Sequence, residues 1–182
     1  MLRLTILLIF TSTVLMSVLL VAIMLADSVP NPAGMPHPVN PGMQIGGDAS
    51  LRQQHIGIYG FLFQGLFYLL VVSLCVLGVA KRYRTTTFYL CMGLSLLSMW
   101  LVWWQIFTHH QNFIVTGETN YFMGFPIATA WLVYGHWLSA VPLILIYTIG
   151  FHHFIYTEED AARFNRLLKE TRAESSQSKA TH

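Results

Sequence analysis

Charged side chains are scarce in this sequence, and long stretches of it have none. Asp, Glu, Lys and Arg make up 10% of the 182 residues, whereas hydrophobic residues make up 54%. A soluble domain carries roughly a quarter charged residues, so this composition is typical of a membrane protein. The net charge of +2 is small, and no basic run with interleaved aromatic residues is present. These two absences argue against a nucleic-acid partner.

Cysteines and the common catalytic motifs are scarce or missing. Cys75 and Cys91 both fall in apolar stretches and form neither a zinc-binding pattern nor a disulfide framework. The sequence has no nucleophile elbow, phosphate-binding loop, HExxH helix or dinucleotide fingerprint, and no histidine boxes of the membrane di-iron type. We therefore predict no catalytic residues and no enzyme activity for the chain alone, with membership of a redox complex left open.

What the sequence does contain is a set of four apolar stretches, each long enough to cross a bilayer as a helix of about 20 residues. The first follows Arg3 and is longer than the apolar region of a signal peptide, about 7–15 residues, so we interpret it as an uncleaved span. The predicted fold class is all-α, a polytopic membrane domain over residues 1–156. Its predicted spans are 4–26, 56–80, 88–107 and 125–151, with a proline-rich loop at 27–55.

The polar segments differ from one another in character. Prolines in the loop at 27–55 favour an extended path without helices. Met35, His37 and Met43 in this loop are of types that bind copper, but a loop without metal is the simpler interpretation, and we predict no metal site. At the other end, Thr157 to Asp160 has the form of a capping box. We predict an amphipathic helix at 157–173 and a disordered tail at 174–182.

The distribution of Lys and Arg predicts the orientation. With four spans, Arg3, the turn at 81–84 and the C-terminal segment lie on one side of the membrane. That side holds all of the ten Lys and Arg residues except Arg52. The positive-inside rule makes it the cytoplasm. We therefore predict a multi-pass protein of the bacterial inner membrane with both termini cytoplasmic.

The predicted spans contain no Asp, Glu, Lys or Arg. Ion-coupled carriers and proton pumps usually place such groups in the membrane, where function offsets their cost. Uncharged sodium sites exist in carriers with paired repeats, but no internal repeat is visible here. An autonomous carrier or channel is therefore the weakest of the hypotheses.

His136 is the polar exception inside the fourth predicted span. A buried imidazole can be satisfied by Ser139, by Gln64 or by the Leu138 carbonyl that Pro142 leaves without a donor. A ligand, quinone or proton-path role is the alternative. Small residues that allow close helix approach, together with these polar ones, indicate a packing face within the chain or against a partner. The residues of this predicted interface are Gly57, Gly60, Gln64, Gly135, His136, Ser139 and Pro142.

A haem b site is a second possibility for the histidines. It needs two axial histidines on different helices at matching depth, and His136 has no such partner in the sequence pattern. His55 can meet His109 or His110 at the edge of the membrane. We predict no cofactor and keep haem b as the alternative, with His55, His109, His110 and His136 as its candidate ligands.

One segment resembles a known group of proteins. Gly124-Phe125-Pro126, followed by Trp131, Trp137 and Pro142, resembles segments in small membrane partners of bacterial sodium/solute symporters. The resemblance implies an accessory subunit and carries over no functional residue. The function predicted is thus a non-catalytic subunit in the lipid bilayer that packs against a larger membrane protein, with a transporter as the expected partner. The alternative is a haem- or quinone-associated membrane anchor of a redox complex.

Overall fold

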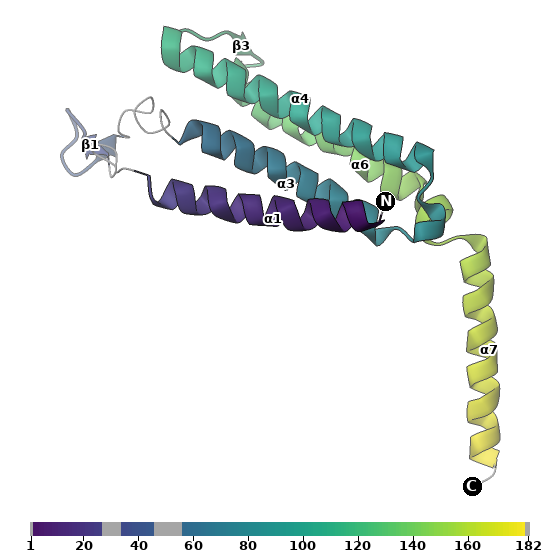
Figure 1. The fold of residues 1–182 in the computed structure, drawn as a ribbon. Helices are drawn as coiled ribbons and strands as arrows, with labels where there is room; N and C mark the ends of the chain where they lie inside the picture. The colour runs from purple at the N-terminus through teal and green to yellow at the C-terminus, as the bar shows by residue number, and fades with distance from the viewer. Residues whose placement is uncertain (1, 27–33, 46–55, 181–182) are drawn as a thin grey trace.

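The computed structural model describes residues 2–26, 34–45 and 56–180 and is built mostly of helices (Figure 1). Four helices are long and apolar enough to cross a membrane, as predicted from the composition. Three of them are α1 (Leu2–Met24), α3 (Gly57–Gly78) and α4 (Thr86–Thr116). The fourth consists of three consecutive pieces, α5 (Ile127–Ala130), the π-helix η2 (Trp131–Gly135) and α6 (His136–Ile149).

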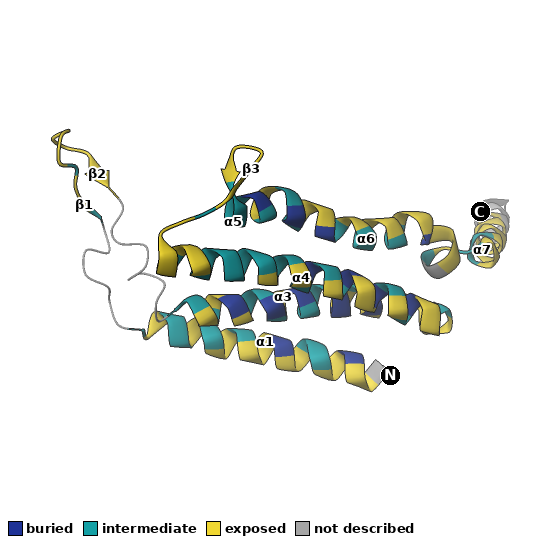
Figure 2. Ribbon diagram, turned by 90° about the horizontal axis from the view of Figure 1, so that it is seen from above, coloured by how far each residue is buried: buried dark blue, intermediate teal, exposed yellow. Residues whose placement is uncertain are grey.

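The long helices alternate in direction and form a row, with α1 against α3, α3 against α4, and α4 against α6 (Figures 1 and 2). Thr5 and Ser12, two turns apart on α1, are its buried positions, and small side chains there let the helix lie close to α3. Because α1 and α6 are the edges of the row, each leaves a broad apolar face exposed.

The core lies where α3, α4 and α6 meet. Long side chains of α6, such as Leu143 and Tyr147, pack against it from the side. The core is built from one stripe of α3 and one of α4, as expected for helices that pack along a single face. Its buried members are Tyr68, Val72, Val76, Val79, Phe88, Met92 and Met99.

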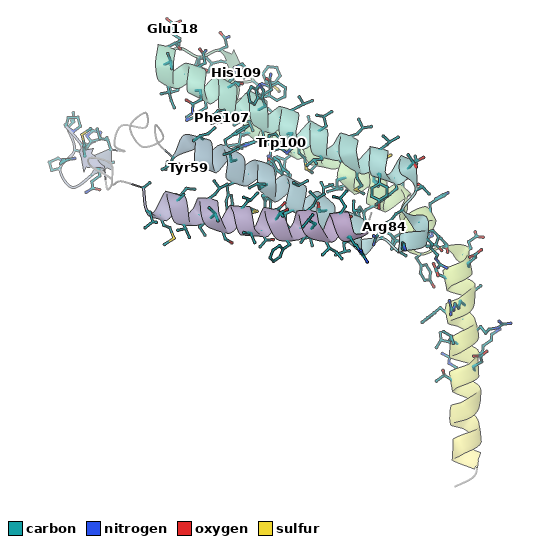
Figure 3. All side chains as sticks on the ribbon, in the orientation of Figure 1. Tyr59, Arg84, Trp100, Phe107, His109 and Glu118 are labelled. Carbon is teal, nitrogen blue, oxygen red and sulfur yellow. The ribbon has the colours of Figure 1, made fainter. Side chains whose placement is uncertain are left out.

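The third predicted span ends at residue 107, and the tryptophans just before this end, Trp100, Trp103 and Trp104, are expected at the membrane interface. Two of them contribute to packing instead. Trp100 lies on the side of α4 that faces α3 (Figure 3), and its ring covers Gly65. The Trp103 indole N–H donates to the Phe61 carbonyl at 3.0 Å. Trp104 alone of this group is exposed. The expectation rested on α4 ending near residue 107. The helix continues to Thr116, so these rings lie well before its end.

The greater length of α4 also changes the surroundings of two histidines. The helix has 31 residues, or about 46 Å at 1.5 Å per residue, and exceeds the roughly 30 Å of a bilayer's hydrocarbon core. His109 and His110 therefore lie within the helix rather than in a loop after it. Gly117 ends α4 with φ +69° and donates its N–H to the Phe113 carbonyl, as a glycine C-cap does.

The turn between α3 and α4 is well capped. It contains the 3₁₀ helix η1 (Lys81–Tyr83). Arg84 donates from Nε to the Val79 carbonyl at 2.8 Å and from its guanidinium to the Leu77 carbonyl at 3.1 Å, which satisfies carbonyls at the end of α3. The Thr85 hydroxyl accepts from the Phe88 N–H at 3.2 Å and caps the start of α4.

Two short hairpins lie at the opposite end, which we call the hairpin end. In the first, β1 (Met35–Pro36) pairs with β2 (Gln44–Ile45). His37 Nδ1 accepts the N–H groups of Val39 and Asn40 there, at 3.1 and 3.0 Å, so this candidate copper ligand stabilises the turn. In the second, β3 (Tyr121–Phe122) pairs with β4 (Phe125–Pro126).

The second hairpin leads into the fourth spanning helix. Met123 and Gly124 at its tip have φ of 49° and 84°, and two positive φ values are typical of the tight turns in two-residue hairpins. Pro126 is the N-cap of α5. Pro142 lies inside α6 without ending it.

The chain leaves the row at the end that holds the N-terminus and η1, which we call the basic end (Figure 1). The π-helix η3 (Phe151–Ile155) follows α6, and α7 (Glu158–Ala180) begins after it. α7 continues to Ala180, so the predicted helix end at 173 and the predicted disorder from 174 are corrected, except for residues 181–182, which lie outside the described part. The charged run after residue 161 carries no proline or glycine to end the helix.

Candidate functional site

His136 forms a hydrogen bond between helices. Its Nδ1 lies 3.1 Å from the hydroxyl of Tyr68 on α3, and Tyr68 is 6% exposed. None of the three partners expected from the sequence supplies this contact to the ring; Ser139 instead donates to the His136 backbone carbonyl at 2.7 Å. The missed signal was spacing, because Tyr68 lies one turn after Gln64 on the same face of α3.

The π-helix η2 and its last residue position His136. A β-carbon on Gly135 would lie 2.6 Å from Trp131 Cε3 and 3.1 Å from Val102 Cγ1. A side chain at this position would therefore collide with the Trp131 ring of the same span and press against Val102 of α4. π-Helical turns insert a residue into an α-helix and are frequent at functional sites. α6 begins directly after this π-helix with His136, whose ring is directed at Tyr68 of α3.

The remaining polar groups of the interior also join helices. The Ser98 hydroxyl of α4 donates to the Ser139 carbonyl of α6 at 3.0 Å, and the Tyr147 hydroxyl donates to the Cys75 carbonyl of α3. Within the described residues, no buried side-chain nitrogen or oxygen lacks a hydrogen-bond partner. In hydrocarbon an unpaired polar group costs several kcal/mol, so these contacts hold α3, α4 and α6 together.

A cleft of about 480 Å³ opens between these helices toward the hairpin end. Aromatic rings of Phe61, Trp103 and Phe107 form much of its wall, and Gln64 and His110 supply its polar groups. Gln64 also interacts with the Tyr68 hydroxyl, so the cleft adjoins the Tyr68–His136 contact. We call it the aromatic cleft. Its full lining is Ile56, Gly57, Gly60, Phe61, Gln64, Trp103, Ile106, Phe107, His110 and Leu132.

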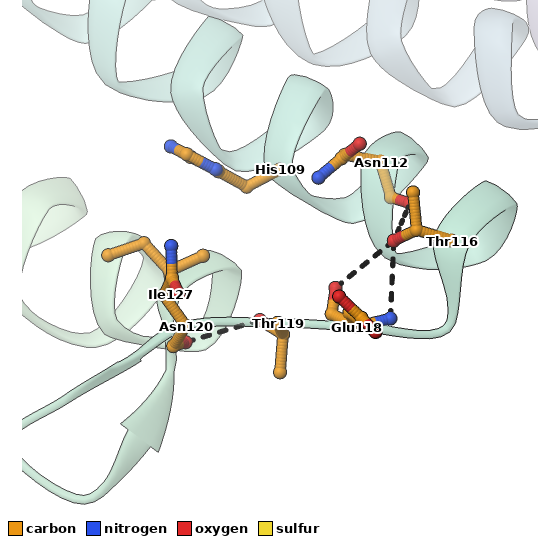
Figure 4. Close-up of a pocket in the computed structure, with 7 residues that line it drawn as sticks. All are labelled: His109, Asn112, Thr116, Glu118, Thr119, Asn120 and Ile127. Atoms are coloured by element: carbon orange, nitrogen blue, oxygen red, sulfur yellow. Dashed lines mark hydrogen bonds between the residues drawn. The ribbon is translucent and has the colours of Figure 1, made fainter.

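His109 faces a different and more polar cavity. This pocket of about 240 Å³ lies between the end of α4 and the segment that leads to β3 (Figure 4). Asn112 and Thr116 lie on the same side of α4 as His109, opposite Glu118 and Asn120. The adjacent residues His109 and His110 thus line separate cavities.

The structure brings some of the predicted site residues together and separates others. Gly57, Gly60 and Gln64 share the aromatic cleft with His110, and Gly135, His136 and Ser139 lie at the contacts of α6 with α3 and α4. Pro142 lies farther along α6, half-buried. His55 lies outside the described residues. Among the residues that the structure describes, no three His, Cys, Asp or Glu side chains gather as a metal site would require.

Four long apolar helices, three of them joined by hydrogen bonds, fit a multi-pass helical membrane protein. Comparison with known proteins adds no closer identification, because no family model, curated protein or solved structure matches the chain.

Proposed function

We propose that this protein is a non-catalytic accessory subunit of a larger inner-membrane protein, with a transporter as the expected partner. The observation that carries the proposal is the uncovered edge formed by the fourth spanning helix. Trp137 is 75% exposed and Leu138 is 67% exposed at this edge. Beside them is an apolar groove of about 260 Å³, lined by Phe122, Ile127, Ala130, Trp131, Tyr134, Gly135 and Leu138.

The shape of this edge is suited to a neighbouring protein helix. Lipid covers a smooth apolar helix well, whereas a groove next to protruding rings suits the side chains of a neighbouring helix. Several polar groups of the interior, by contrast, already join helices of this chain: Tyr68 with His136, Ser98 with Ser139, and Tyr147 with Cys75. The segment that resembles symporter partners, from Gly124 to Pro142, forms this same edge.

The proposed orientation follows from the charges at the basic end. Arg3 lies in the first turn of α1, while Lys81, Arg82 and Arg84 lie in the turn after α3. The basic residues of α7 follow at the same end (Figure 1). The positive-inside rule places this end in the cytoplasm.

Site-specific photo-crosslinking in intact cells tests the proposal. A photoreactive residue at position 137 or 138 is expected to give one adduct with a larger membrane protein. The matched controls are Phe10 and Val18, which are 67% and 59% exposed on α1. Adducts with lipid alone at 137 and 138, together with a monomer in mild detergent, would refute the subunit hypothesis.

A membrane anchor of a redox complex is the second candidate, and the aromatic cleft favours it. Aromatic walls with an amide and an imidazole match a lipid-soluble quinone, whose ring stacks on the walls and whose carbonyl oxygens accept hydrogen bonds. Quenching of tryptophan fluorescence by a quinone, lost in Phe107→Ala and retained in Trp137→Phe, is expected under this hypothesis. A Soret band in the purified protein would instead indicate haem.

A further inference from the structure

Helix α7 is attached to the rest of the protein by a compact set of polar contacts. Arg82 of η1 forms an ion pair with Asp160 in the first turn of α7. The Tyr83 hydroxyl lies 2.8 Å from Thr157 Oγ1 and donates to Asp160 Oδ2 at 3.1 Å. Thr157 and Asp160 also cap each other, with the Asp160 N–H 3.4 Å from Thr157 Oγ1 and the Thr157 N–H 3.4 Å from Asp160 Oδ2. We call these four residues the η1–α7 junction.

The junction holds α7 across the direction of the spanning helices. In Figure 1 α7 runs across the direction of the row, and in Figure 2, which is turned from that view, it is seen end-on. A helix perpendicular to membrane-spanning helices lies parallel to the membrane plane. With 23 residues, α7 extends about 35 Å along that plane.

The junction also determines which side of α7 faces the rest of the protein. Asp160 contacts η1, and Phe164 and Leu167 follow it at four and seven residues, on the same face of the helix. Ala161, half-buried, is followed on this face at three and seven residues by Phe164 and Leu168. The side of α7 that meets the spanning helices therefore continues as its apolar side.

This apolar side has no cover within the described structure. Phe164 is 55% exposed and Leu167 is 54% exposed. Over residues 163–172 the other sides of the helix carry four basic residues and a single acid, Glu170. The basic residues are Arg163, Arg166, Lys169 and Arg172.

We propose that α7 binds the membrane surface at the basic end, with Phe164, Leu167 and Leu168 in the boundary between head groups and acyl chains and the basic residues on anionic phospholipid head groups. A helix with one apolar side and Lys or Arg on the rest is suited to this interface, and basic residues next to a membrane are attracted to anionic lipid. The proposal does not depend on the partner of the fourth spanning helix.

The junction fixes the orientation of α7 relative to η1. Hydrogen bonds from Arg82 and then Thr157 hold the pKa of the Asp160 carboxyl below its usual range, so the ion pair persists at neutral pH. α7 is thereby presented to the lipid already oriented, and less conformational entropy is lost when it binds.

The full-length protein in lipid nanodiscs tests the proposal. With Cys75 and Cys91 replaced by Ala, a single cysteine at Leu167 carries an environment-sensitive fluorophore, and Arg166→Cys is the matched control on the other side of the helix. In phosphatidylcholine mixed with phosphatidylglycerol, the probe at 167 is expected to be quenched by spin-labelled lipid and shielded from iodide. The probe at 166 is expected to show the reverse.

Two comparisons make the outcome decisive. In phosphatidylcholine alone, the probe at 167 is expected to become several-fold more accessible to iodide; equal shielding in both lipids would overturn the role of the anionic head groups. Iodide access at 167 that equals access at 166 in the mixed lipid would overturn membrane binding and leave a protein partner as the cover for this side.

The junction has its own test in the same discs. Arg82→Asp is expected to reduce the protection of the probe at 167, and the double variant Arg82→Asp/Asp160→Arg is expected to restore it. Lys81→Ala, in the same turn but outside the junction, serves as the control and should leave protection unchanged. Full protection in Arg82→Asp would show that lipid alone orients α7.

Discussion

At the position of Gly65, the ring of Trp100 occupies the space that a side chain would need. A β-carbon there would lie 2.5 Å from Trp100 Cζ2, closer than packed atoms approach each other. Gly65 thus sets the distance between α3 and α4 at a position next to Gln64 of the aromatic cleft. At Gly60, which lies five residues earlier and lines the cleft, a β-carbon would have no neighbour within 4 Å.

Gly65→Ala is therefore expected to destabilise the protein. Overpacking of this kind costs about 1–3 kcal/mol, and thermal unfolding in detergent measures it as a lower midpoint. Gly60→Ala is the matched control and should be nearly neutral. Adding Trp100→Phe to Gly65→Ala should recover part of the loss, and a Gly65→Ala protein as stable as the control would show that the helices are farther apart than the structure has them.

The contact between Tyr68 and His136 supports a second prediction at this scale. Hydrogen bonds between helices in membranes average about 0.6 kcal/mol and reach about 1.7 kcal/mol, so Tyr68→Phe should cost a small part of the stability. His136→Ala should cost more, because it also removes packing and leaves the Tyr68 hydroxyl without its partner. Reduced yield and a lower unfolding midpoint of the assembled protein are the expected results. Normal yield of the His136→Ala protein with a lost activity would instead give the histidine a direct functional role.

Among the elements, α7 is the one whose position depends on charge. The pKa of Asp160 is lowered from its ordinary value of 3.8, chiefly by the hydrogen bond from Arg82. Because this pKa is lower in the folded protein, the junction contributes its full stabilisation above pH 3.8, and the contribution is lost as the pH falls through the lowered value.

Acid is therefore expected to release α7, while the spanning helices, which contain no Asp or Glu, remain assembled. The distance between spin labels on η1 and α7, followed from pH 7 to below pH 3.8, would measure the release. Asp160→Asn should show the released state already at neutral pH. Release of α7 between pH 7 and pH 5 would contradict a carboxyl with a lowered pKa.

For the whole molecule, the clearest prediction concerns its topology. All Lys and Arg residues except Arg52 belong to the basic end or to α7, so a reporter fused after His182 should be cytoplasmic and one inserted in the loop at 27–55 should be periplasmic. Carbonate washing should leave the protein in the membrane, because four apolar spans hold it there. A periplasmic C-terminal reporter or release by carbonate would contradict the topology.

Composition and periodicity were enough for the long helices but not for their exact extents. Apolar runs of span length predicted four helices, and these are present. The end of α4 was placed too early because His109, His110 and Asn112 resemble a loop in composition, although they continue the helix. The role of Trp100 and Trp103 was missed for the same reason, since a ring near a supposed helix end is expected at the interface.

The candidate site was less predictable than the fold. His136, Gln64, Gly57 and Gly60 stand out in the sequence as polar or small residues in apolar surroundings. Tyr68 does not, because tyrosine is common in apolar helices, and its pairing with His136 depends on how far α3 and the fourth span overlap. The separation of His109 from His110 into two cavities depends likewise on the rotation of α4.

What the sequence by itself determined is the number of spanning helices and the end at which the positive charges gather, because both depend on the cost of transferring each segment into hydrocarbon. Only the tertiary structure decided the order of the helices in the row, the Tyr68–His136 contact, the aromatic cleft and the perpendicular course of α7. These features depend on contacts between residues far apart in the chain. Their energies come from shape and hydrogen-bond geometry, which a one-dimensional pattern does not contain.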